Sequence, residues 1–423
     1  MAQFVKFDKI VPEGKALAHW HDKALFAVGP LPGESAMVRI TREKRDWAEG
    51  VVRQFAAVAS PHRGPAHEDH YLSCSPWQGV DYQYQLELKR GMLAELFGRP
   101  GLELPVAEML PSPRQFGYRN KLEFSLKPDE RGRLELAFHE RGSFRSLIAA
   151  TQGCVLGSEA MNAAARAVLE RLNELDVADI ADTLTVRQSH THGHVIVVVM
   201  VRESAARNWD RLVVSQAAGV AVARKVRHDT YETLWTHGNI ELAETFGGVE
   251  LAYPWDSFFQ VNLPGFELAL ERILTHIQPG TKVVDLYGGA GTIGLPAARI
   301  AREVAGVEIV ASSVALANRN ALSNQLANYQ ALAALSEKID PTLLADADAV
   351  IVDPPRAGLH KHVIRLLLEA RPRQIIYLSC NPVTQVRDIM LLANSYTPGA
   401  PTGFDFYPGT LHLESLAVLT LTQ

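Results

Sequence analysis

The hydrophobic and polar positions of the chain follow three patterns in succession. Between residues 4 and 52, short apolar runs alternate with glycine and proline, which predicts the short strands of a small antiparallel barrel of the OB type. A polar, turn-rich segment at residues 61–69 is typical of a linker. Apolar spacing then predicts helices over 83–96 and 160–172 and strands over 122–126, 134–139 and 195–201.

From residue 281 onward, buried strands alternate with helices, which predicts a doubly wound parallel sheet. We therefore expect an α/β fold in four parts. These are an OB-like barrel at 1–60, a linker and packing segment at 61–84, a central α+β domain at 85–250, and a Rossmann-like domain at 251–423.

Composition narrows the class of protein. Hydrophobic residues make up 47% and charged residues 21% of the 423 positions, so wholesale disorder is excluded. The formal net charge of -5 means that any nucleic-acid surface is a local patch. The sequence has 3 cysteines, far too few for a disulfide framework, and it lacks a long apolar run. We expect a soluble, cytoplasmic protein without a membrane partner, and a monomer by default.

The strands after residue 113 carry basic residues with aromatic residues between them. Such a surface suits a phosphate backbone with splayed bases, and RNA is the partner that it suggests. A solvated hairpin whose charges pair with local glutamates explains the same pattern. The basic positions are Arg114, Arg119, Lys121, Lys127, Arg131, Arg133, Arg141 and Arg145, and the aromatic ones are Phe116, Tyr118 and Phe144.

Two carboxyl-end motifs of the last domain indicate a ligand site. The run DLYGGAGT from Asp285 to Thr292 places glycines after the first strand, and Glu308 ends the next strand, where it can accept from ribose hydroxyls. This spacing favours an adenosyl-methionine type of site over a dinucleotide site or a structural turn. The run DPPRAGL, which begins at Asp353, follows another strand and is expected at the same edge of the sheet. Its alternative role is only to terminate that strand.

A thiol stands at a third strand end, in the run SCNP that contains Cys380. A thiolate there would be a nucleophile. Arg387 would either lower the pKa of this thiol or hold a phosphate. The alternative is an inert, buried thiol, as most cysteines are. Thiolate addition to C6 is the activation that C5 methylation of a pyrimidine requires. Glu414 is the candidate base for the C5 proton, and an ordinary strand-edge carboxylate is the alternative.

Together these runs resemble the uracil-5 RNA methyltransferases, which use S-adenosylmethionine to make 5-methyluridine in tRNA or ribosomal RNA. The matching runs, in family order, are FGYRNKLEFS, FFQVN, DLYGGAGTIGL, DPPRAGL, SCNP with Thr384 and Arg387-Asp388, and HLESL. The N-terminal runs KIVPEGKALAH and LPGE resemble the TRAM module, an OB-like RNA-binding barrel.

The resemblance implies a role for each matching residue. Cys380 is implied to be the nucleophile and Glu414 the base. The residues implied to bind the cofactor are Gln260, Tyr287, Thr292, Glu308 and Asp353, where Thr292 replaces a common asparagine. The residues implied to face the RNA are Arg119, Asn120, Lys121 and Arg387.

Some relatives with a TRAM module hold an iron–sulfur cluster on four cysteines. Only Cys74 and Cys154 match two of those places, and Glu68 and Trp77 stand near the others. Because two thiols do not provide four-cysteine ligation, we expect no cluster and no metal.

Three functions follow from these observations. The first is methylation of a specific uridine by an RNA uracil-C5 methyltransferase, with 23S ribosomal RNA preferred over tRNA as substrate. The second is a cytosine-C5 methyltransferase, which the absence of cysteine from the DPPR run disfavours. The third is a non-catalytic RNA-binding protein or chaperone that retains the fold, although RNA binding alone requires neither Cys380 nor Glu414.

Overall fold

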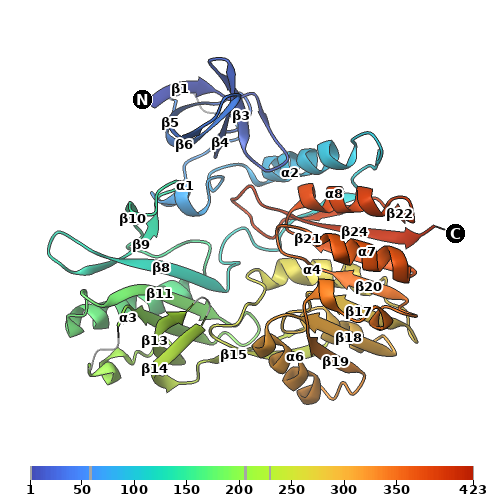
Figure 1. Cartoon of the computed structure of the whole chain (residues 1–423). Coiled ribbons are helices and arrows are strands. Elements are labelled where there is room, and N and C mark those ends of the chain that lie inside the picture. Colours follow the sequence, from blue (N-terminus) through green and yellow to red (C-terminus); the bar gives the residue numbers. More distant parts are fainter. Residues whose placement is uncertain (1, 57–59, 204–206, 228–229, 423) are drawn as a thin grey trace.

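Three large sheets of different topology and one two-stranded sheet make up the described part of the molecule. A computed structural model describes residues 2–56, 60–203, 207–227 and 230–422. Figure 1 shows the N-terminal sheet above the C-terminal α/β unit, with the central sheet beside that unit. The expected end of the first domain at residue 60 borders residues 57–59, which lie outside the described residues.

The N-terminal sheet is curled, which agrees with a barrel-like module. Its strand order is β1-β5-β6-β4-β3-β2. Alternate residues of β3 and β4 are buried, among them Ala16, Ala18 and Leu25, because successive side chains of a strand face opposite sides. The strands are β1 (Ala2–Lys6), β2 (Lys9–Ile10), β3 (Ala16–Trp20), β4 (Lys23–Val28), β5 (Ser35–Glu43) and β6 (Trp47–Phe55).

The central sheet confirms the predicted strands around residues 122–139 and 195–201. Its order is β10-β9-β8-β11-β12-β13-β14, and helix α3 (Glu159–Leu175) packs on it. Ser158 caps α3 by accepting from the Met161 N–H, and the apolar stripe of the helix faces the sheet. The strands are β8 (Lys121–Pro128), β9 (Leu134–His139), β10 (Leu147–Ala149), β11 (Ala181–Gln188), β12 (Val195–Val201), β13 (Gly219–Arg227) and β14 (Thr230–Gly238).

A two-stranded hairpin, β15 (Glu241–Phe246) with β16 (Val249–Pro254), follows the central sheet and leads into α4 (Leu263–Leu274). Short helical segments lie between the larger elements. They are α1 (Tyr71–Cys74), η1 (Trp209–Leu212), η2 (Ser336–Lys338) and η3 (Pro341–Leu343).

The C-terminal sheet has the order β19-β18-β17-β20-β21-β24-β23-β7, and β22 also pairs with β24. Its first five strands are parallel, as predicted, but β24 runs antiparallel to β21 and β23 antiparallel to β24. The sheet is therefore mixed, because no crossover helix separates β22, β23 and β24. Its strands are β17 (Lys282–Leu286), β18 (Glu303–Glu308), β19 (Tyr329–Ala333), β20 (Ala349–Val352), β21 (Gln374–Ser379), β22 (Tyr396–Pro398), β23 (Thr402–Phe404) and β24 (Glu414–Leu421).

The helices of this unit follow the predicted alternation. They are α5 (Gly294–Ala298), α6 (Ala311–Ser323), α7 (Lys361–Ala370) and α8 (Pro382–Leu392). Among the described residues, no helix has the length and apolar character needed to cross a membrane.

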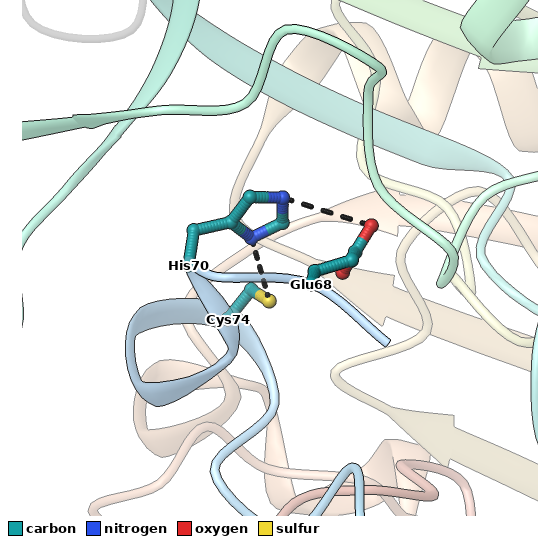
Figure 2. Close-up of side chains that lie close together, drawn as sticks. All are labelled: Glu68, His70 and Cys74. Atoms are coloured by element: carbon teal, nitrogen blue, oxygen red, sulfur yellow. Dashed lines mark hydrogen bonds and ion pairs between the residues drawn. The ribbon is translucent and has the colours of Figure 1, made fainter. Parts of the chain in front are cut away.

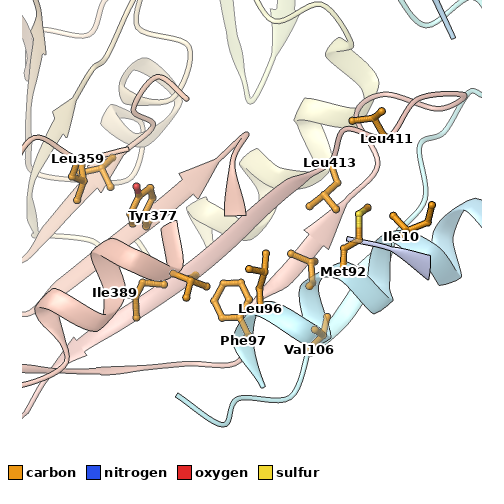
Figure 3. Packing of buried hydrophobic residues seen from close by; sticks show 14 of the residues in the cluster. Ile10, Met92, Leu96, Phe97, Val106, Leu359, Tyr377, Ile389, Leu411 and Leu413 are labelled. Atoms are coloured by element: carbon orange, nitrogen blue, oxygen red, sulfur yellow. The ribbon is translucent and has the colours of Figure 1, made fainter. Parts of the chain in front are cut away.

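Residues 82–110 belong to the C-terminal unit, whereas the sequence placed the start of the central domain at residue 85. Helix α2 (Tyr82–Phe97) buries Met92, Leu96 and Phe97 in one core with Leu413, and Ile10 of the N-terminal sheet shares that core (Figure 3). Strand β7 (Glu108–Leu110) pairs in parallel with β23 at the sheet edge. The apolar spacing of α2 predicts a helix but does not tell which sheet the helix covers.

A buried ion pair fixes α2 on this unit. Lys89 Nζ lies 2.6 Å from Asp405 Oδ1, and both side chains are fully buried. A packing that separated the two side chains would leave an unpaired buried charge, which is strongly destabilising. The pair therefore favours the observed position of α2.

Candidate active site

Three strand ends bring a thiol and two carboxyl groups together. Strands β21 and β24 are antiparallel with Ser379 opposite Ser415, so Cys380 comes just past the end of β21, beside Glu414 at the start of β24. Asp353 follows β20, the parallel neighbour of β21. The sequence predicted a shared edge for Asp353 and Cys380, and the structure places them there together with Glu414.

Burial and mutual repulsion shift the pKa values of this cluster upward. Burial, then Glu414 and Asp353, raise the pKa of the Cys380 thiol to about 11, and Arg356 opposes the shift. Burial, and then Asp353, hold the pKa of Glu414 well above its usual value. Burial raises the pKa of Asp353 to about 7. A positively charged ligand in this cluster would lower all three pKa values.

Two residues of the cluster escaped the sequence analysis. Arg356 is the positive group beside Cys380 and Glu414, and Tyr407 donates a hydrogen bond to Glu414. Arg356 belongs to the quoted DPPRAGL run, so its motif gave a signal. Tyr407 lies in the segment between β23 and β24, where no pattern marks it.

The glycine loop and Glu308 form a second, adjacent cluster. Glu308 Oε2 accepts a hydrogen bond of 3.1 Å from the Gly289 N–H, and its Oε1 accepts from Val310 at 2.8 Å. Asp285, the last charged residue of β17, is buried, and its pKa rises to about 8 through burial, then Asp353 and then Glu308. Three carboxyl groups therefore converge where the loop leaves the sheet.

Three other predicted cofactor residues lie around this loop. Tyr287 adopts φ 65, and its hydroxyl is hydrogen-bonded to Ser336 and to the backbone of His360. Thr292 lies in the turn just before α5. Gln260 lies in the segment before α4, where its carbonyl accepts from Asn120 Nδ2 at 2.8 Å.

The predicted RNA-facing run divides into different roles. Asn120 is buried and joins the central domain to the FFQVN segment, because its backbone N–H also donates to Val261. Arg119 and Lys121 line a cavity of about 460 Å³ that also contains Cys154 and His412. Burial, then Arg356 and other cations, lower the pKa of His412 to about 4, so this region carries positive potential.

Arg387 contacts the loop of the DPPRAGL run. Its guanidinium donates to Asp388 Oδ1 at 2.8 Å and to the Ala357 carbonyl at 2.9 Å, while half of its side chain stays exposed. The charge that lowers the Cys380 pKa is Arg356 rather than Arg387.

A sequence profile described as tRNA (uracil-5-)-methyltransferase matches residues 81–422. The chain belongs to this family. It is therefore an RNA uracil-C5 methyltransferase, as the six motifs predicted. The match spans α2 and β7 as well as the central and C-terminal sheets.

Relatives of this uracil-C5 methyltransferase extend over the whole chain. An uncharacterized RNA methyltransferase of Gloeobacter violaceus is 31% identical, covering 96% of this chain and 93% of the relative. One of Nostoc sp. is 28% identical, covering 97% and 94%. The tRNA (uracil-54, C5)-methyltransferase of Pyrococcus abyssi, solved in complex with S-adenosyl-L-homocysteine, has the same fold, with a TM-score of 0.78, 24% identity, and coverage of 99% of this chain and 100% of that one.

Proposed function

We propose that this enzyme methylates a specific uridine of RNA through a transient bond between Cys380 Sγ and uracil C6. The observation that carries this proposal is the position of Cys380 beside buried Glu414, at the end of two neighbouring strands. A nucleophile next to a proton acceptor is what addition to C6 and proton removal from C5 require. A non-catalytic RNA-binding protein has no use for this pair.

The proposed methyl donor is S-adenosylmethionine, which supplies an electrophilic methyl group when bound. Its sulfonium and ammonium groups are positive, and the carboxyl groups of Asp285, Glu308 and Asp353 converge beside the glycine loop. Gly289 has φ 53, and no atom lies within 4 Å of the position that a Cβ would take, so the loop leaves space for a ligand. We propose that Gln260, Tyr287 and Thr292 complete this pocket.

The residues of the chain act in a fixed order. The Cys380 thiolate bonds to C6 of a uridine flipped into the site, which makes C5 nucleophilic. After C5 has gained the methyl group, the Glu414 carboxylate removes the C5 proton. The electron pair restores the C5–C6 double bond as the C6–Sγ bond breaks, and the thiolate is released. Arg356 stabilises the thiolate before it attacks C6 and after it is released.

The N-terminal sheet is proposed to act as a TRAM module that holds RNA. A cavity of about 520 Å³ is lined by Lys15, Phe26 and Trp47 of this sheet together with Arg141 and Arg356. Basic side chains with aromatic side chains between them suit single-stranded RNA. Ribosomal RNA is the substrate that we predicted from the sequence, and tRNA is the substrate in the description of the family.

The test is a covalent trap. Purified enzyme is incubated with S-adenosylmethionine and total RNA that contains 5-fluorouridine. The fluorine at C5 replaces the proton that Glu414 would remove, so the covalent intermediate is not released. We expect a denaturation-resistant adduct that is lost in Cys380→Ala, and sequencing of the attached RNA decides between ribosomal RNA and tRNA. RNA binding without an adduct would refute the covalent mechanism.

A further inference from the structure

A second cluster of reactive side chains lies outside the active site, where α1 meets the loop before α3. Atoms of Glu68, His70 and Cys74 that are suited to bind metal lie within 4.8 Å of one another (Figure 2). His70 Nδ1 lies 3.3 Å from Cys74 Sγ. Cys154 adds a second thiol, 3.9 Å from Glu68 Oε2 and hydrogen-bonded to Cys74. The mechanism above uses none of these groups.

The orientation of His70 is that of a metal ligand. Its Nε2 lies 3.0 Å from the carbonyl oxygen of Gly153. A carbonyl only accepts, so the neutral ring carries its hydrogen on Nε2 and presents the Nδ1 lone pair to Cys74. Histidines that bind metals almost always donate their other N–H to a carbonyl or carboxylate in this way.

A second layer of hydrogen bonds holds the other groups in place. Glu68 Oε1 accepts from the Val155 N–H at 2.6 Å. The Gln78 side-chain amide donates to Glu68 Oε2 at 3.0 Å and to Ser75 Oγ at 2.9 Å, and Ser75 Oγ in turn lies 3.2 Å from Cys74 Sγ. The His70 and Glu68 side chains are only 5% and 12% exposed. The cluster is thus pre-organised, with His70 and Cys154 buried and Glu68 and Cys74 half-buried.

We propose that Glu68, His70, Cys74 and Cys154 bind one Zn²⁺ ion. Two thiolates, one imidazole and one carboxylate are a four-ligand set of the kind that Zn²⁺ prefers. In a tetrahedral zinc site of this composition, neighbouring ligand atoms are separated by about 3.3–3.8 Å. The distances of 3.3 Å from His70 Nδ1 to Cys74 Sγ and 3.9 Å from Cys154 Sγ to Glu68 Oε2 are near that range. Glu68 Oε1 lies 3.6 Å from His70 Nε2, so the carboxylate would have to turn toward Nδ1 to bind the ion.

The donor set selects against hard cations and against a four-cysteine cluster. Hard cations such as Mg²⁺ and Ca²⁺ take oxygen ligands, and this site offers one carboxylate. A four-cysteine iron–sulfur cluster is not available, because the third cysteine of the sequence, Cys380, belongs to the active site. The expectation of no metal rests on the number of cysteines; the proposal departs from it because the fold brings His70 to Cys74.

The proposed role of the ion is structural. Four protein ligands leave no open position for a substrate, which is the arrangement of structural zinc sites. Three ligands come from residues 68–74, between the N-terminal sheet and α2, and the fourth comes from the central domain. The ion would thus fasten the interdomain segment to the central domain, independently of methyl transfer.

The first test is the metal content of the full-length protein, purified without chelators and dialysed. Mass spectrometry of the elements should find about one zinc ion per chain, and His70→Ala and Cys154→Ser should each retain less than about a tenth of it. Cys380→Ser, which removes the thiol outside the cluster, should keep its zinc. Replacement of zinc by Co²⁺ should give the absorption of a tetrahedral thiolate site.

A second measurement covers the case in which the variants misfold. A strong chelator should lower the melting temperature of the wild-type protein, and added Zn²⁺ should restore it. The proposal is overturned if the wild-type protein neither contains zinc nor binds added Zn²⁺ or Co²⁺, if a Cys74–Cys154 disulfide forms instead, or if iron and sulfide occupy the site. Zinc that persists in both variants would overturn it as well. None of these results depends on methyltransferase activity.

Discussion

The charge on Cys380 depends on three neighbours that act in opposite directions. Glu414 and Asp353 disfavour the thiolate, whereas Arg356 favours it. With a pKa of about 11, the thiol is therefore mostly protonated and unreactive in the free enzyme. The positive charge of the methyl donor beside the carboxyl groups would activate the thiol only when the site is filled, which protects it from side reactions.

Replacement of these neighbours should move the titration of Cys380 in opposite directions. Arg356→Met removes a positive charge, so the pKa of the thiol should rise, whereas Glu414→Gln removes a negative charge and should lower it, each by about one unit. The rate of Cys380 alkylation by iodoacetamide, followed against pH by peptide mass spectrometry, measures both shifts. Arg365→Met, on the exposed face of α7, is the control. Shifts of the same sign in Arg356→Met and Glu414→Gln would contradict the electrostatic account.

Loss of the base should separate adduct formation from release. Glu414→Gln should still attack C6 but should retain the C5 proton, so methylated RNA stays bound to Cys380 and turnover falls by about 10²–10⁴-fold. Denaturing gels of the variant with unmodified RNA should show the adduct, and Cys380→Ala/Glu414→Gln should not. Normal turnover of Glu414→Gln would show that another group is the base.

Among the secondary-structure elements, the connection of the DPPRAGL loop to α8 depends on one buried carboxylate. Asp388 Oδ2 accepts from the Leu359 N–H at 2.7 Å and from the Tyr377 hydroxyl at 2.8 Å, and Asp388 is fully buried. The loop carries Arg356 and the helix follows Cys380. This carboxylate therefore sets the distance between the thiol and its positive neighbour.

Asp388→Ala should destabilise the fold, because it leaves a buried hydroxyl and a buried N–H without acceptors. Each unpaired group costs about 1–3 kcal/mol. Arg387→Ala removes an exposed partner of the same carboxylate and should cost less than about 1 kcal/mol. Urea denaturation followed by circular dichroism compares the two variants. Equal losses would show that the exposed ion pair matters more than the buried network.

Patterns along the chain predict elements better than they predict the pairing between elements. Strands β17, β18, β20 and β21 are largely apolar runs, so the sequence located them and the site residues at their ends, whereas β19 has a mixed pattern and was not predicted. Strands β23 and β7 have three residues each, too short for a periodic pattern, and their pairing arises only from the fold. Cys380 follows one of these apolar runs and Glu414 belongs to the HLESL motif, so both were named as candidates, whereas no pattern marks Tyr407 or His70.

At the scale of the whole molecule, the two cavities connect all three sheets. Arg141 of the central domain and His412 of the C-terminal unit line both cavities. Lys15, near the start of the N-terminal sheet, lines the cavity of about 520 Å³. An RNA that occupied both would contact every part of the chain. Base recognition and catalysis would then depend on how the parts are held together.

Lys121 offers a test of this RNA path, since it lines the cavity of about 460 Å³ with Arg119 and its side chain is 41% exposed. Lys121→Ala should weaken binding to the trapped RNA about 3–10-fold. It should also reduce the slope of log Kd against log salt concentration by about one. Glu123→Ala, which frees Lys121 from its ion pair, should not weaken binding. Filter binding across a salt series measures both. An unchanged slope in Lys121→Ala would place the RNA elsewhere.

The pairing of β7 with β23 has a consequence for biosynthesis. Residues 108–110 leave the ribosome long before residues 402–404, and the entire central sheet is made between them. The pairing of β7 with β23 therefore forms only after residues 402–404 have been made, while the central domain has time to fold first as an insertion. A fragment that begins at residue 251 would lack α2 and β7, and its exposed apolar face and open strand edge would promote aggregation.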